Sequence, residues 1–532
     1  MKKWLAVIVL SLAQFVMLLD SSVMNVSITN IVADLHTTVA GIQLAITFYT
    51  LVMAAFMLTG GKLGDILGRR KAFKTGLIIY GIGSLITSLS IGLPMLLFGW
   101  SIVEGLGAIL VIPAIAALVA ANYKGRDRVA AYGILGAVSG AAVAVGPLIG
   151  GAITTYSSWR YVFASETVIV LVIFFFFANK INDIEASKKT TLDIPSVFLS
   201  ATGLFLVVFA ILQSKVWGWI KPMSVPTIAG QAITPFGFSV VPFLIAGGAF
   251  VLWYFIQWQY KLKEKGKDPL LDPATLKIPA MQSGLTNITM QYLLTAGLFF
   301  ILPIYLQMVL GLDALQTGMK ILPLSVALVV FSILGSRMVS KFTPKRIIVW
   351  GKLLIVAGLF TILASIDPEL KSMVFNFGML IIGAGIGLMA SQIGNVVLSS
   401  VDESQSSEAG GLQGTFQNLG TSIGTALIGS VLIASLTTGF VSAATSGKST
   451  LPQNVKTYIS DSSKKGAAVV NKDQVYNYSI SKGLSSEEAT EISDYYLNAQ
   501  IQSLKFSMLA LALFSLVGLA FSKKLPDELI KS

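Results

Sequence analysis

Three carboxylic acids interrupt stretches of the chain that are otherwise apolar. Asp20, Glu104 and Glu166 each lie in a hydrophobic run long enough to cross a bilayer, which takes roughly 20 residues of helix. An ionised carboxylate is costly in hydrocarbon, so such residues usually face a cavity and mark the path of a proton or another cation. Burial also favours the neutral form of a carboxyl, which lets it exchange protons near neutral pH. We expect all three to couple proton movement to transport, with an interfacial structural role as the alternative for Glu166, six residues after Arg160.

The composition places these carboxyls in a polytopic membrane protein. Hydrophobic residues make up 54% of the 532 positions and charged residues only 12%, about half the charged share of a soluble domain. Apolar runs between polar breaks predict fourteen membrane-spanning helices, at residues 4–23, 41–60, 73–90, 94–121, 129–154, 161–178, 194–212, 240–260, 281–309, 318–339, 347–364, 373–398, 410–436 and 501–521.

Charged linkers divide the predicted spans into three parts. Residues 1–180 would form one six-helix bundle, 181–277 a linker with two additional spans, and 278–532 a second six-helix bundle. The last part includes a long outer loop, 437–500, between the thirteenth and fourteenth spans. Ser485-Ser-Glu-Glu488 in this loop has the pattern of a capping box and predicts a short helix there. We expect a surface loop, with a lid over the outer mouth as the alternative.

Two glycine-containing motifs of the first predicted bundle indicate specific structural roles, one at the edge of the bundle and one within a span. Gly61-Lys-Leu-Gly-Asp65-Ile-Leu-Gly68-Arg69-Arg70-Lys71 connects the second and third spans, and Gly335-Ser-Arg337 with Pro344-Lys-Arg346 echoes it in the second bundle. Glycines allow a tight turn, and the arginines can reach carbonyls or carboxylates across an interface. We expect Gly61, Asp65, Gly68, Arg69 and Arg70 to form a conformational latch.

The second motif lies in the fifth predicted span. It consists of Gly136, Gly140, Gly146, Pro147, Gly150 and Gly151. Glycines four residues apart leave a helix face bare, so that another helix can approach closely. Proline removes a backbone donor and bends the helix. The motif therefore predicts a tightly packed, kinked span.

These motifs together resemble the fourteen-span drug:proton antiporters of the major facilitator superfamily, of the quaternary-ammonium and multidrug efflux type. Nearly the whole chain takes part: the glycine-rich string of span five resembles the branch's antiporter motif, and Gly61–Lys71 its loop signature. Further similar strings are Leu19-Asp20-Ser-Ser-Val-Met-Asn25-Val, Trp159-Arg-Tyr-Val-Phe163, Leu192-Asp-Ile-Pro195 and Leu412-Gln-Gly-Thr-Phe-Gln-Asn-Leu-Gly420. The resemblance implies an all-α fold of two six-helix bundles plus two extra helices, energised by a proton gradient rather than by a cofactor.

One position departs from the family pattern. The fourth span usually reads R-x-x-Q-G, whereas this chain has Ser101-Ile-Val-Glu104-Gly105. A site that loses the arginine and gains a carboxylate should be more negative and more often protonated when empty. The usual arginine-assisted proton relay is therefore in doubt here.

The expected cargo is a small lipophilic cation such as a drug, dye or antiseptic, because negative groups and apolar surface suit such compounds. We expect Gln43, Tyr49, Gln413, Phe416 and Asn418 to supply polar and aromatic groups to the cavity. The alternative is an exporter or flippase of a lipid or lipid-linked molecule. We expect no nucleic acid partner, a monomer in contact with membrane lipids, and a contribution to antibiotic resistance.

Enzymatic chemistry is not indicated. The chain has no cysteine, which excludes thiol catalysis and cysteine-ligated metals. It shows no P-loop, no G-x-S-x-G elbow and no H-E-x-x-H pair, so that neither an ATP motor nor a hydrolase is expected. We expect no metal site.

Lysine and arginine predict the orientation. With the N-terminus in the cytoplasm, 26 of the 38 basic residues lie on the inner side, and six of the other twelve lie in the long loop. Basic residues concentrate in short cytoplasmic loops. We therefore expect the protein to lie in the plasma membrane with both termini in the cytoplasm.

This orientation gives the first prediction. An accessibility tag attached to Ser532 should stay unreactive toward an impermeant reagent in intact cells and react once the cells are opened. Labelling from outside would overturn the topology.

Overall fold

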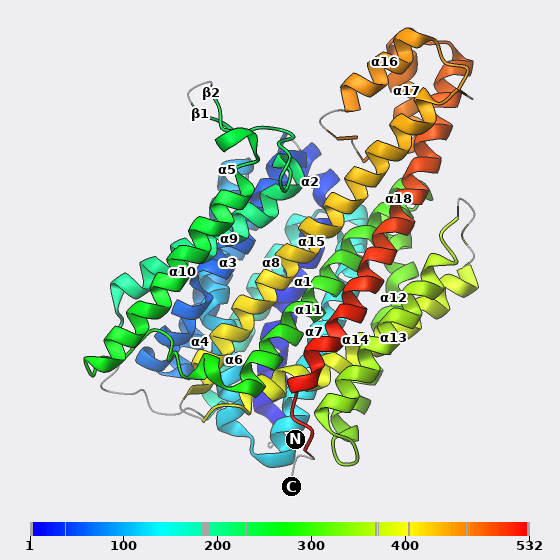
Figure 1. Ribbon diagram of the computed structural model, residues 1–532. Helices are drawn as coiled ribbons and strands as arrows, with labels where there is room; N and C mark the ends of the chain where they lie inside the picture. Colours follow the sequence, from blue (N-terminus) through cyan, green and yellow to red (C-terminus); the bar gives the residue numbers. More distant parts are fainter. Residues whose placement is uncertain are drawn as a thin grey trace.

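The chain folds into a helical membrane protein whose two ends lie on the same side. The computed structural model describes residues 4–37, 39–182, 191–228, 231–367, 370, 372–402, 405–447, 449–463, 466–467 and 469–528. Both ends of the trace lie at the bottom of Figure 1, and the helices α16 and α17 lie at the opposite end. We call these ends the terminal side and the distal side.

The first part of the chain contains helices that pack mainly on one another. In order they are α1 (Leu5–Val26), α2 (Ile28–Asp34), α3 (Val39–Leu67), α4 (Arg69–Ser88), α5 (Leu93–Leu96), the π-helical η2 (Leu97–Glu104), α6 (Gly105–Asn122), α7 (Gly125–Tyr156), α8 (Arg160–Val172) and η3 (Ile173–Phe177). Their buried faces are mostly apolar, as the hydrophobic runs predict, but they include serine, threonine and acidic side chains.

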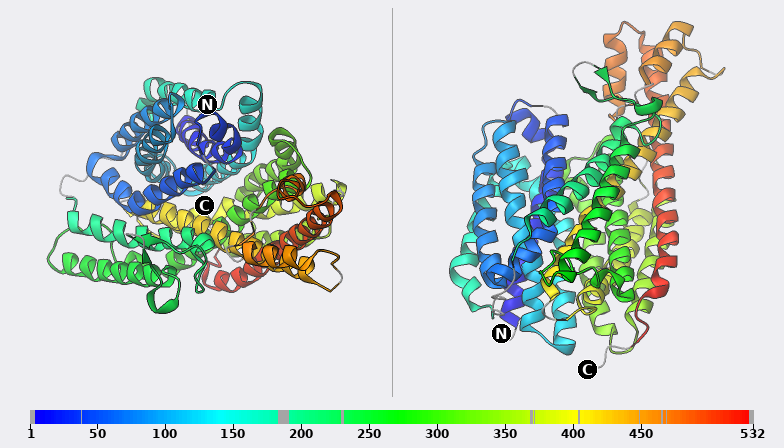
Figure 2. Two further views of the ribbon diagram at one scale, coloured as in Figure 1. Left: turned by 90° about the horizontal axis from the view of Figure 1, so that it is seen from above. Right: turned by 60° about the vertical axis from the view of Figure 1, so that its left-hand side comes forward.

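A separate helix pair follows. It comprises α9 (Ile194–Trp217) and α10 (Val241–Glu264), joined by a turn with the two-residue strands β1 (Thr227–Ile228) and β2 (Gln231–Ala232). The Asp193 carboxylate caps α9 by accepting the backbone N–H of Ser196, and it also accepts the indole N–H of Trp258 from α10. Partial burial opposes charge on Asp193, but hydrogen bonds from the Ser196 hydroxyl, the Trp258 indole and the Ser196 backbone outweigh it and lower the pKa of the carboxyl. The pair lies at the periphery, where α9 packs on both α3 and α15 (Figure 2).

The remaining helices form a second group. They are α11 (Pro279–Pro303), the π-helical η7 (Ile304–Val309), α12 (Ala314–Met338), α13 (Pro344–Leu363), α14 (Ser372–Leu398), α15 (Ser406–Thr445), α16 (Gln453–Ser462), α17 (Lys472–Ser481) and α18 (Ser486–Ala520). Helices α7 and α15 each contact helices of both groups. They form the main packing interface between the two parts of the chain.

Each of the fourteen predicted spans coincides with a helix. In the described part of the chain, twelve helices are long and apolar enough to cross a membrane. The other two predicted spans correspond to α4, whose first turns carry four basic residues, and α7, of which the stretch Ala130–Ala142 counts as a shorter apolar helix. Fourteen crossings and the three-part division therefore stay predictions.

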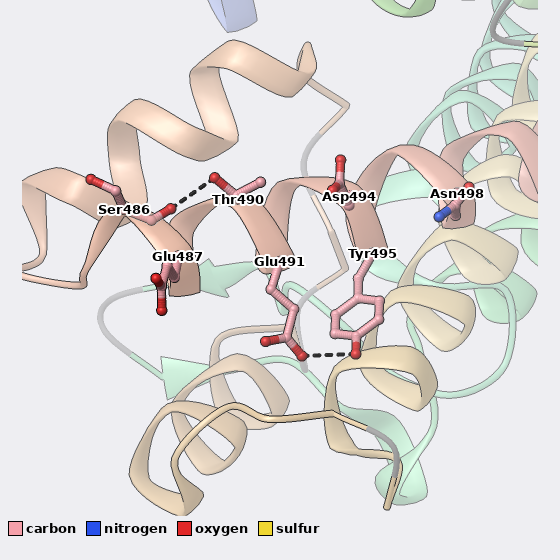
Figure 3. A pocket seen from close by; sticks show the side chains of 7 residues that line it. All are labelled: Ser486, Glu487, Thr490, Glu491, Asp494, Tyr495 and Asn498. Carbon is pink, nitrogen blue, oxygen red and sulfur yellow. Dashed lines mark hydrogen bonds between the residues drawn. The ribbon is translucent and has the colours of Figure 1, made fainter.

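The predicted outer loop is mostly helical. Helices α15 and α18 continue past the predicted spans and, with α16 and α17, enclose a small apolar core that includes Phe440, Ile459 and Tyr496. The capping box at Ser485 and Glu488 is present. The helix that it opens is not short, however, because α18 is 35 residues long and includes most of the last predicted span. A shallow polar hollow of about 610 Å³ lies on this outer part of α18, where Tyr495 donates a hydrogen bond to Glu491 (Figure 3).

Candidate functional site

The three predicted carboxyl groups come together inside the first helix group. Asp20 from α1, Glu104 from η2 and Glu166 from α8 have no exposed surface, and an oxygen of each lies within 4.8 Å of an oxygen of the others. We call this set the carboxyl cluster. Asp20 and Glu166 each lie six residues from the distal end of their helix, which places them about 9 Å below that end at 1.5 Å per residue.

Aromatic and hydroxyl groups complete the cluster. The indole N–H of Trp100 donates to both oxygens of Asp20, at 2.8 and 2.9 Å. Glu166 accepts hydrogen bonds from Ser84 at 3.2 Å and from Tyr80 at 3.4 Å, both on α4. Tyr49 of α3 stacks on Trp100 with 4.8 Å between ring centroids.

Of the three carboxyl groups, Glu104 has the fewest hydrogen-bond partners. Both of its carboxyl oxygens are buried without a hydrogen-bond partner among the described residues. Its backbone is held close to α4 at Gly83, where a side-chain carbon would lie 2.5 Å from the Glu104 nitrogen. The π-helical η2, which ends at Glu104, presents Trp100 and Glu104 to Asp20 together. Such π segments occur frequently at functional sites.

No basic side chain neutralises the cluster among the residues that the structure describes. The ion pairs of this part join Arg69 to Asp65 and Arg160 to Asp34. Arg160 also donates to the carbonyl of Ser90, so it is engaged at the distal surface rather than with Glu166. Ser101, which stands where the family has arginine, donates to the backbone carbonyl of Ala45 at 2.8 Å.

A second feature is a cavity between the two helix groups. It has a volume of about 130 Å³ and is lined from α1, α6, α7, α11, α12, α14 and α15. Its polar wall residues include Gln14, Ser139, Gln291, Gln413 and Gln417, and none of the described lining residues is charged.

The carboxyl cluster does not line this cavity. On α1 the lining residues are Gln14 and Leu18, whereas Asp20 follows Leu18 by two positions and therefore points about 200° away. Asp20 faces the interior of the first helix group instead, where Trp100 binds it.

The five residues predicted for the cavity have different positions. Gln413 lines the cavity. Tyr49 belongs to the surroundings of the carboxyl cluster, Phe416 packs against the apolar core, and the Asn418 amide bonds to Gly414 within α15. The Gln43 side chain lies outside the described residues. Gln14, Gln291 and Gln417 also line the cavity but were not predicted. A polar side chain within an apolar run is the sequence signal that could indicate them.

The glycines of span five serve two interfaces. A side-chain carbon at Gly136 would lie 2.9 Å from the Ala390 carbonyl oxygen of α14, and one at Gly140 would overlap Leu328 of α12. Further along α7, Gly146 lies against Ser22 and Gly150 against Val23, both on α1. Gly151 is buried, and the side chain of Pro147 lies outside the described residues. Helix α7 thus contacts both the second helix group and α1, the helix that carries Asp20.

The predicted latch lies at the terminal side between α3 and α4. The motif is helical except at Gly68, whose φ of 91° separates the two helices. Asp65 pairs with Arg69 at 3.6 Å, and Arg70 donates to the Ile181 carbonyl. A side-chain carbon at Gly61 would lie 2.7 Å from the Ser407 carbonyl oxygen of α15. The motif therefore contacts the second helix group directly.

A buried lysine in the second helix group was not anticipated. Lys352 of α13 has no exposed surface. Its ammonium group donates to Asn287, to the Gly518 carbonyl near the end of α18 and to Ser522 at 2.8 Å. A lone lysine five residues into a predicted apolar span was the available signal.

The fold and the sequence define the class of this protein. The family model of the Major Facilitator Superfamily matches residues 10–425, and the chain belongs to this family of membrane transporters, which are not enzymes. The fold agrees with solved structures: the human organic anion transporter MFSD10 aligns with a TM-score of 0.55 over 94% of this chain and 99% of that one, at 12% identity. A double tryptophan mutant of XylE aligns with a TM-score of 0.52 over 99% and 96%, at 13% identity.

Curated relatives narrow the class to efflux transporters. A puromycin resistance protein of Streptomyces alboniger is 27% identical over 81% of this chain and 82% of its own length. A probable actinorhodin transporter of Streptomyces coelicolor is 28% identical over 82% and 73%. The multidrug transporter protein MdtP of Bacillus subtilis is 25% identical over 81% and 76%. The similarity supports a drug exporter.

The α7 interfaces give a prediction about Gly146. Gly146→Leu should abolish export while the protein still inserts, because the new side chain would collide with Ser22 and force α1 away from α7. Export of ethidium or of the neutral dye Nile red, whichever the wild type moves faster, is measured at equal membrane abundance. Gly247→Leu is the matched control, since nothing lies within 4 Å of a carbon added there. Normal export by the Gly146 variant would mean that the motif serves only helix packing.

The latch gives a separate prediction. Asp65→Asn should slow turnover several-fold and leave dye affinity nearly unchanged, because the Asp65–Arg69 pair lies at the terminal edge, beyond contact distance of the cavity. Asp268→Asn, an exposed substitution in the linker after α10, should change neither quantity. Weaker binding with normal turnover would count against a latch.

Proposed function

We propose that this protein is a proton-coupled antiporter of the plasma membrane that exports lipophilic small molecules by alternating access, with both termini in the cytoplasm. The observation that carries the proposal is the carboxyl cluster, in which three buried acids meet without a basic partner among the described residues. The names of the curated relatives, which refer to puromycin resistance, actinorhodin and multidrug transport, support an antibiotic or drug as cargo.

The negative charge of three neighbouring carboxylates has to be compensated by a bound cation, either a proton or a metal ion. Two like charges 4 Å apart repel by about 4 kcal/mol at an effective dielectric constant of 20, and an unpaired buried charge carries a further desolvation penalty. Three ionised carboxylates within 4.8 Å are therefore not stable together. Protons are the simplest occupants, and the cluster then titrates as a unit. A bound metal ion would satisfy the same electrostatics and is an alternative outcome of the test.

Helix α7 offers a route by which the cluster and the cavity influence one another. Gly146 and Gly150 contact α1 beside Asp20, and Gly136 and Gly140 contact the second helix group. Gly136 and Gly140 also line the cavity. Loss of a proton that shifts α1 would therefore alter the cavity wall through α7. By linkage, substrate binding would weaken proton binding by the same factor.

The location of the cluster bears on the predicted preference for cations. That preference assumed acidic groups near the substrate, but Asp20 points away from the cavity wall. Direct pairing of a cationic drug with Asp20 would require α1 to rotate. Cationic cargo thus stays a prediction that is not supported by the charge of the cavity.

The test measures proton movement coupled to substrate. Wild-type protein in liposomes loaded with a pH-sensitive dye should show proton flux when ethidium or Nile red is added. Asp20→Asn should abolish this flux, because it removes the acid that Trp100 holds. Glu104→Gln and Glu166→Gln should each reduce the number of protons moved per substrate. Glu264→Gln, an exposed change at the end of α10, should behave as wild type.

Two outcomes would contradict the assignment. Normal coupled flux in a variant with all three acids neutralised would place proton coupling elsewhere in the chain. Substrate movement that requires sodium or a divalent ion, and that persists without a pH gradient, would assign the cluster to a metal ion instead of protons.

A further inference from the structure

The cavity between the helix groups has an unusual polar character. Four glutamines contribute to its wall: Gln14 from α1, Gln291 from α11, and Gln413 and Gln417 from α15. Gln413 and Gln417 are four residues apart and therefore share a face of α15. No lining residue in the described part of the chain is charged. Asp20 is turned into the first helix group, where Trp100 donates to it, and Glu408, two residues before the lining residue Gly410, accepts the backbone N–H of Asp272.

The three cavity-lining glutamines of the second helix group make no hydrogen bond to protein within the part of the chain that the structure describes. The Gln413 side-chain oxygen is buried and accepts no hydrogen bond among the described residues. Gln291 is 8% exposed, and neither it nor Gln417 takes part in a hydrogen bond within the described structure. By contrast, Gln14 donates to Ser139 at 2.6 Å. A buried amide oxygen normally accepts a hydrogen bond, so the Gln413 oxygen is available to a donor inside the cavity.

We propose that this cavity recognises uncharged, hydrogen-bonding aromatic compounds, and that Gln291, Gln413 and Gln417 bind their carbonyl or hydroxyl groups. The inference rests on the proposed export function and specifies its substrate class. An amide both donates and accepts, so it suits cargo with several oxygen functions. Tyr292 and Phe299, also on the wall, supply ring surface for the apolar part.

A cation fits the same cavity less well. It would lose its hydration and meet no counter-charge, because the carboxyl cluster serves a different occupant inside the first helix group. Cation–π attraction to the ring faces compensates part of that loss, but it is smaller than the cost of burying an unpaired charge. A neutral compound with an oxygen acceptor gains the amide hydrogen bonds without the desolvation cost of a charge.

The charge dependence can be measured with a matched pair of probes. Triphenylphosphine oxide and methyltriphenylphosphonium both carry three phenyl rings on phosphorus, and they differ in that the first has a neutral oxygen acceptor where the second has a methyl group and a positive charge. Equilibrium binding to the purified full-length protein should favour the neutral oxide. Gln413→Leu should weaken oxide binding about three- to tenfold, the loss expected for one hydrogen bond. Gln413→Glu should reverse the preference by adding a counter-charge. Gln282→Leu on α11 is the control, since that amide bonds to the Leu276 carbonyl outside the cavity.

The outcomes separate this inference from the export proposal. Tighter binding of the phosphonium, absent binding of the oxide, or oxide binding that Gln413→Leu leaves unchanged would overturn the inference alone. Oxide binding with the expected dependence on Gln413, without proton-driven movement of the oxide in liposomes, would support the inference and contradict export.

Discussion

Three carboxyl groups that share one apolar site impose the constraint on which the rest of this transporter depends. Asp20, Glu104 and Glu166 lie within 4.8 Å of one another with no exposed surface. Their charges must be compensated, and the described structure offers hydrogen bonds from Trp100, Tyr80 and Ser84 but no basic side chain. The helices that bring them together are held by close contacts such as that of Gly83 with Glu104. A change in the occupancy of the cluster therefore acts on α1, α4, η2 and α8 together.

The molecule separates its charged site from its binding cavity. In many sites that couple a proton to a ligand, the proton and a cationic ligand compete for the same acidic group and so exclude each other directly. Here the cavity wall presents amides and aromatic rings, while the acids face the other side of α1. Coupling then has to pass through helix packing. Helix α7, whose glycines contact α1, α12 and α14, is the element in the described structure best placed to transmit it.

The sequence predicted the helices well and singled out the three acids, whose role stays a prediction, because both signals depend on local composition. A carboxylate in an apolar run stands out without knowledge of its neighbours, as Asp20 and Glu104 do. That Glu166 joins them depends on tertiary packing between α4 and α8, which no spacing along the chain encodes. The helix opened by Ser485 was expected to be short, because its polar first turns hide the continuity with the apolar span that follows. The position of Lys352 near a helix end could be predicted from the sequence, but its burial could not, because its partners Asn287 and Ser522 lie on other helices.

Infrared difference spectroscopy on the purified protein tests the shared occupancy of the cluster most directly. Addition of a transported compound, Nile red or triphenylphosphine oxide, should remove a band from the carbonyl stretch of a protonated carboxylic acid. Heavy-water exchange should shift this band, and Glu104→Gln should shift or abolish it, as should Asp20→Asn, because the groups titrate as one unit. A band that persists unchanged in both variants, or no loss of a protonated carboxyl on substrate binding, would contradict a proton held by these three acids.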